Sequence, residues 1–166
     1  MSCRGVHLAL DDDDVAALRA VDEDERANYA TEVLEEKFFA GDKSRYQQSD
    51  KAWDAMHRAL TDGELEWDNG SYPLNHVILG GEVMYPEDDY LISLKTPAQV
   101  REIAAALREV GRERLRAGYD RIDPDSYGCP KSDEDFDYTW TWFAGVAAFY
   151  QRAAEAGCWV LFTADQ

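Results

Sequence analysis

The sequence predicts one domain of the α/β class, with an α+β arrangement as the alternative. Short apolar runs near the two ends of the chain, at 5–10 and 157–163, are typical of strands. Between them, apolar residues recur at helical spacing, most clearly at 50–61, 97–110 and 133–156. The chain has 166 residues, of which 45% are hydrophobic, and this is enough to bury one core. No internal repeat or low-complexity linker divides it, so we expect a single domain over residues 1–166.

The N-terminal part predicts a strand and then two helices. Alternation of apolar residues over 5–10 indicates the strand. Four aspartates at 11–14 suit a helix start, because carboxylates interact favourably with the positive end of the helix dipole. A second helix is expected over 23–39, ended by Gly41 and with its apolar residues turned inward. These are Tyr29, Val33, Leu34 and Phe38, with Phe39 as a further candidate.

The next helix, over 50–61, carries the most regular apolar face of this part of the chain. Ser49 or Asp50 is expected to cap its start, and Gly63 is placed to end it in a left-handed conformation. The face consists of residues at i, i+3, i+4 and i+7, which are Trp53, Met56, His57 and Leu60. We expect Trp53 to lie in the core.

The C-terminal part predicts two helices and two strands. A short strand is expected at 91–94, followed by a helix that starts with Thr96 as its cap, Pro97 and the capping-box residue Gln99. Residues 118–131 contain several Gly and Pro breakers and are expected to form a loop. Ser132 can cap the long aromatic helix that follows. We expect that helix, with Phe143, Trp140 and Trp142, to be buried nearly all round, and the run CWVLFTA to form an interior strand near the first one.

The charge is unevenly distributed along the chain. The formal net charge is −17, and residues 59–94 contain no Lys or Arg. Residues 95–121, by contrast, carry seven basic and four acidic residues. Such a surface repels a polyanion, so nucleic-acid binding is not expected. The acidic stretch holds eight carboxylates: Asp62, Glu64, Glu66, Asp68, Glu82, Glu87, Asp88 and Asp89.

The remaining composition predicts a cytoplasmic protein without a membrane span. Three scattered cysteines and no CxxC pair suit reduced thiols. The N-terminus lacks the features of a signal peptide, and no window approaches 18 consecutive apolar residues. Neither a cofactor fingerprint nor a metal-ligand spacing is present, because His7, His57 and His76 lie far apart.

Several ordered motifs resemble the DUF1877 family of uncharacterised bacterial proteins, also called YfbM-like. The segment DKAWDAMHRALTDG at 50–63 is similar to a helix of that family, and Pro73-Leu74 with VILGG at 77–81 is similar to its next segment. The C-terminal FYQRAAEAGCWVLFTAD at 149–165 is similar to the family's ending. The resemblance implies an α/β sandwich with helices around a mixed sheet, and it assigns no catalytic residue.

Two groups of residues are candidates for a ligand site. Asp54 precedes His57 by three residues and could orient its imidazole, although a core histidine bonded to backbone is the alternative. Asn75 and His76 precede Gly80 and Gly81, which suit either close approach of a ligand or a tight turn. Trp53 shares the face of His57 and completes this set.

We therefore expect a binding module for a basic protein partner or a small ligand, with neutralisation of a basic effector or toxin as one version. Glu64, Glu66, Trp67 and Asp68 are the expected partner surface, because an acidic loop with aromatics can steer a basic partner. The alternative is a small-molecule enzyme whose pocket uses Asp54, His57 and His76. The oligomeric state is left open. Convergence of those three side chains on one open pocket would favour the enzyme, and a His57 that is buried and bonded to backbone would favour the binding module.

Overall fold

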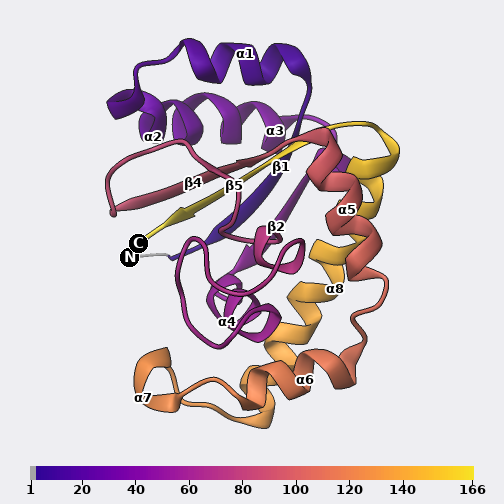
Figure 1. The fold of residues 1–166 in the computed structure, drawn as a ribbon. Coiled ribbons are helices and arrows are strands. Elements are labelled where there is room, and N and C mark those ends of the chain that lie inside the picture. Colours follow the sequence, from indigo (N-terminus) through magenta and orange to yellow (C-terminus); the bar gives the residue numbers. More distant parts are fainter. Residues whose placement is uncertain (1–2) are drawn as a thin grey trace.

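A computed structural model describes residues 3–166 and shows one five-stranded sheet between two helical layers (Figure 1). The strand order is β2-β1-β5-β4-β3, and every recorded pairing is antiparallel. The expected α/β architecture with flanking helices is confirmed, but the expectation of a mixed sheet is wrong. The strands are β1 (Gly5–Leu10), β2 (Tyr46–Asp50), β3 (Glu82–Val83), β4 (Tyr90–Lys95) and β5 (Trp159–Asp165).

The C-terminal strand β5 lies at the centre of the sheet, between β1 and β4. Its register with β1 runs from Gly5 opposite Ala164 to Leu10 opposite Trp159. The two terminal strands therefore pair, as expected from the sequence. Because helices cover both faces of the sheet, a continuous apolar run is suited to this position, and residues 160–164 are buried.

One face of the sheet is covered by the helices of residues 12–40 (Figure 1). The Asp11–Asp14 capping box starts the first of them, in agreement with the expected helix start. The second stretch changes geometry in its middle, where Ala30–Glu35 forms a π-helix. Leu34 and Phe38 are buried as expected, but Val33 is 46% exposed and Phe39 is 37% exposed. The wider π turn changes the angular spacing, so the inward stripe does not include Val33. The segments are α1 (Asp12–Ala20), η1 (Glu23–Glu25), α2 (Arg26–Tyr29), η2 (Ala30–Glu35) and α3 (Glu36–Ala40).

The other face is covered by a larger helical layer (Figure 1). Thr96 and Gln99 form the expected capping box, and Ser132 caps the long C-terminal helix. Phe143 is buried in that helix, but Trp140 and Trp142 are only partly buried, so the helix is not enclosed on all sides. No helix among residues 3–166 combines the length and apolar character needed to cross a membrane. The helices are α4 (Trp53–Leu60), α5 (Pro97–Leu107), α6 (Arg112–Asp120), α7 (Pro124–Tyr127) and α8 (Asp133–Glu155).

Several elements differ from the sequence-based expectation. Besides the two described below, β3 and α7 are not predicted, and residues 118–131, expected to form a loop, contain the end of α6 and all of α7. Strand β2 is not predicted, because its sequence YQQSD lacks an alternation of apolar and polar residues. Such a polar sequence suits its position at the edge of the sheet. Ser49 and Asp50 belong to this strand, so α4 begins at Trp53 with Ala52 at its N-cap. Helix α6 was also not expected. It packs closely on α4, because a Cβ on Gly118 would lie 2.0 Å from the carbonyl oxygen of Ala59.

Candidate functional site

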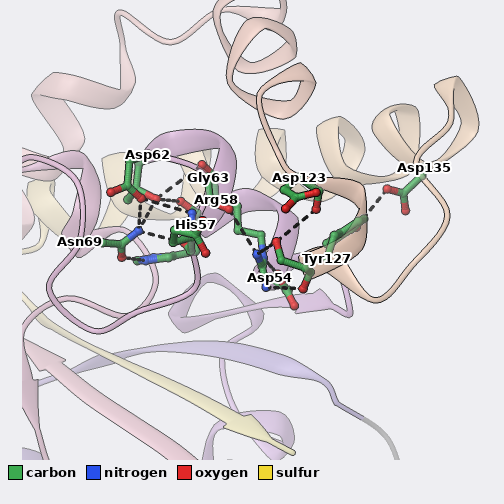
Figure 2. Close-up of polar contacts among 12 residues, drawn as sticks. Asp54, His57, Arg58, Asp62, Gly63, Asn69, Asp123, Tyr127 and Asp135 are labelled. Carbon is green, nitrogen blue, oxygen red and sulfur yellow. Dashed lines mark hydrogen bonds and ion pairs between the residues drawn. The ribbon is translucent and has the colours of Figure 1, made fainter.

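Arg58 is the centre of a polar network that joins α4 to the segments following it (Figure 2). The residue is only 6% exposed. Its guanidinium donates to Asp54 Oδ1 at 2.6 Å, to the carbonyl of Gly63 at 3.2 Å, and to the hydroxyl and carbonyl of Ser126, each at 3.2 Å. A buried guanidinium requires such partners, so Arg58 ties α4 to the start of residues 61–74 and to α7.

Asp54 interacts with Arg58 and not with His57. Residues four apart on a helix are neighbours, and the Asp54–Arg58 pair uses that spacing. Burial raises the pKa of Asp54, while the hydrogen bond and charge of Arg58 oppose this shift. Among the residues described, no hydrogen bond joins Asp54 to His57, so the expectation that Asp54 orients the imidazole is wrong.

His57 is a buried residue that binds the loop following α4 through Asn69 (Figure 2). It is 1% exposed, and its Nε2 lies 2.8 Å from Asn69 Oδ1. The Asn69 amide nitrogen donates to Thr61 Oγ1, Asp62 Oδ1 and the carbonyl of Glu64, so its oxygen accepts from His57 and the Nε2–H tautomer follows. Burial lowers the pKa of His57. The neutral imidazole therefore positions Asn69, and the loop shields the imidazole from solvent.

The second predicted group lies in a separate network. His76 Nδ1 is 2.8 Å from Asn75 Oδ1, and the Gly80 N–H donates to the Asn75 carbonyl at 2.9 Å. A Cβ on Gly80 would lie 2.4 Å from that carbonyl oxygen. Gly81 has φ +126°, and its Cβ would lie 2.6 Å from the carbonyl oxygen of Leu94. Close contacts with backbone carbonyls thus explain why glycine is needed at both positions, which agrees with the tight-turn alternative. No hydrogen bond of the described chain joins His76 to His57 or Asp54.

Trp53, the remaining member of the predicted ligand set, lies in the core. It is 3% exposed, and its indole N–H donates to the carbonyl of Cys3 at 2.8 Å. Its ring also lies 5.8 Å from that of Phe162 in the central strand. This agrees with the expectation that Trp53 lies in the core.

The acidic stretch remains almost unpaired in the folded protein. All eight of its carboxylate residues are exposed. Within residues 3–166, the only ion pair that involves one of them joins Glu82 to Arg19 at 2.7 Å. Glu64, Glu66 and Asp68 therefore project from a loop whose backbone Asn69 fixes, while Trp67 is half-buried against the core.

A cavity of about 410 Å³ lies between this loop and α6, and sequence reasoning missed it. Its basic side chains are Arg114 and Arg121, which belong to the basic segment 95–121 recognised in the sequence. The charge count signalled the segment, but only the unexpected helix α6 explains which of its arginines reach the loop.

A second buried polar cluster surrounds the carbonyls of Val77 and Ile78. His7 Nε2 and the Tyr150 hydroxyl both donate to the Val77 carbonyl, at 2.9 and 2.7 Å. Lys95 Nζ donates to the Ile78 carbonyl at 2.5 Å. Burial lowers the pKa of Lys95 well below its ordinary value, and burial together with Lys95 lowers the pKa of His7 to about 3. We expect His7 to be neutral near pH 7, and this cluster to hold the VILGG segment in place.

Metal binding finds no support in the described part of the chain. No group of three or more His, Cys, Asp or Glu residues there is arranged to hold a metal ion. The three cysteines, all within this part, are free thiols.

The fold and the site define an α/β protein with an antiparallel sheet between two helical layers and a polar network on one of them. The sequence profile of DUF1877, a domain of unknown function, matches residues 1–163, and the chain belongs to this family.

The crystal structure of YfbM from Escherichia coli, a protein of unknown function, is similar with a TM-score of 0.71. The two chains are 21% identical, and the match covers 97% of this chain and 99% of that one. At this identity the likeness establishes the fold alone. The comparison with curated proteins found no match.

Proposed function

We propose that the protein is a cytoplasmic binding module that presents its acidic loop, residues 61–74, to a basic protein partner. The observation that carries the proposal is the state of Glu64, Glu66 and Asp68. All three are exposed, and none forms an ion pair within residues 3–166. Unbalanced carboxylates on one loop attract a basic surface and accelerate encounter with it.

The inner side of the loop supports the same role. Asn69 and Arg58 hold the loop through four hydrogen bonds, two to the carbonyls of Glu64 and Gly63 and two to the side chains of Thr61 and Asp62. A loop that is already ordered loses little conformational entropy when a partner binds. Trp67 is half-buried beside the carboxylates and offers an aromatic contact, a residue type enriched at interfaces.

Two triple variants of equal charge test this proposal. Isothermal titration calorimetry would measure binding of a short polylysine peptide to the wild-type chain, to E64K/E66K/D68K and to E87K/D88K/D89K. We expect the first variant to lose about tenfold in affinity, since exposed charge pairs contribute roughly 0.2–1 kcal/mol each. The salt dependence should weaken with it. Equal losses in both variants would show that net charge alone attracts the peptide and would refute the assignment to this loop.

A further inference from the structure

The cavity beside the acidic loop has the dimensions and lining of a small-ligand site. It measures about 410 Å³, within the usual range of ligand pockets, which is roughly 300–1,000 Å³. The end of α4 and the loop form one wall, and α6 with Val110 forms the other. Its apolar lining includes Leu60, Leu74, Val110 and Leu115. An aliphatic body of a ligand would find contacts on these side chains.

Arg114 and Arg121 supply the positive charge of the cavity. Neither pairs with a carboxylate within residues 3–166, and their hydrogen bonds are long contacts of 3.4 Å to backbone carbonyls. Two other arginines of α6 behave differently. Arg112 pairs with Asp137, and Arg116 pairs with Asp120 and Asp133. Among the arginines at 112–121, the two that line the cavity are therefore the two left without a carboxylate partner.

The walls of the cavity are fixed by the surrounding structure. His57 holds Asn69, which in turn holds Thr61 and Asp62, and both of the latter line the cavity. Gly118 keeps α6 in direct contact with α4. Asp62 contributes one negative charge, but its Oδ1 already accepts from Asn69 and from the Glu64 N–H. The charged side chains of the lining therefore sum to a single positive charge.

We propose that this cavity binds a small organic acid. Its carboxylate would lie between Arg114 and Arg121, because guanidinium groups bind carboxylates with charge-assisted hydrogen bonds. Its aliphatic body would lie against Leu74, Val110 and Leu115. This site is distinct from the outer, acidic side of the loop proposed above for a basic partner, and it requires no protein partner.

Hexanoate is a suitable probe, with hexylamine as the probe of opposite charge. Calorimetry or amide NMR titration would compare the wild-type chain with R114Q and R121Q. We expect saturable hexanoate binding that each substitution weakens by about tenfold or more, since hydrogen bonds to charged groups are the stronger class. D62N should tighten binding by removing the one negative charge of the lining.

R101Q is the matched control. Arg101 lies on α5, is exposed, and does not line the cavity. Its loss should leave hexanoate binding unchanged. Circular dichroism would establish that the variants fold, which their exposed positions favour. The proposal is overturned if hexanoate does not bind saturably, if hexylamine binds as well, or if R101Q weakens binding as much as R114Q and R121Q.

Discussion

Within residues 3–166, one arginine and one lysine are buried, and their surroundings differ. Arg58 in α4 is 6% exposed and has a carboxylate partner, Asp54, at 2.6 Å. Lys95 in β4 is 0% exposed, and its recorded partners are the neutral oxygens of Ile78 and Ser93, each at 2.5 Å. The part of the chain that the structure describes thus contains a buried charge that is paired and a buried amine that lacks a counter-ion.

The chemistry of the buried base thus determines which partners it requires. A guanidinium stays protonated in proteins, so burial of Arg58 demands compensating oxygens. An amine can lose its proton, and desolvation lowers the pKa of Lys95 for that reason. Arg58 therefore orders a surface loop through its charge, whereas Lys95 donates to neutral oxygens inside the core.

The largest expected contrast is between Arg58→Met and Lys95→Met. Removal of Arg58 leaves Asp54 and the carbonyls of Gly63 and Ser126 without their donor, and we expect a loss of about 3–5 kcal/mol in the free energy of unfolding. Lys95→Met should leave stability near pH 7 unchanged or increased, because methionine removes the cost of deprotonation. Urea denaturation measures both.

Arg101→Met is the control for this contrast, since Arg101 is exposed and its substitution should change stability by no more than about 0.5 kcal/mol. A large loss in Lys95→Met together with a small loss in Arg58→Met would reverse the comparison.

A smaller effect is expected in the pH dependence of stability. With the pKa of Lys95 lowered in the folded state, the unfolded chain binds more protons between the folded pKa and the ordinary pKa of lysine. This contribution to stability should therefore rise with pH toward 9, by at most about 1.4 kcal/mol per unit for one proton, and be lost as pH falls. Subtracting the curve of Lys95→Met isolates this contribution. Parallel curves would show that Lys95 keeps its proton in the folded protein.

Much of the fold followed from the sequence because local signals agreed with it. The capping residues of α1, α5 and α8 and the apolar pattern of the terminal strands are local, and each predicted its element. Strand β2 and helix α6 were not predicted from the sequence. The polar YQQSD forms a strand through its pairing with β1, and this is a tertiary effect that the segment's own pattern does not show.

The candidate site was less predictable, because its contacts join distant segments. The spacing of Asp54 fits both His57 at i+3 and Arg58 at i+4, and only the structure distinguishes them. Asn69, which holds the loop, gives no sequence signal of its own. Arg114 and Arg121 lie about fifty residues beyond the loop that they face, so their convergence depends on the packing of α6 against α4.

The smallest expected effect is the coupling between Lys95 and Ser93. Ser93 Oγ accepts from Lys95 and donates to the Ile78 carbonyl at 3.1 Å. A double-mutant cycle of Ser93→Ala and Lys95→Met isolates the hydrogen bond between the two side chains, provided that each substitution adds no new contact. A neutral amine should give a coupling energy of about 0.5–1.5 kcal/mol, while a charged one should give about 1.5–3 kcal/mol. Repeating the cycle at pH 9 provides the control, since an amine that is already neutral at pH 7 gives the same coupling at both values. A coupling that is large at pH 7 and falls at pH 9 would mean that Lys95 is buried as a charge, and the contrast with Arg58 would then disappear.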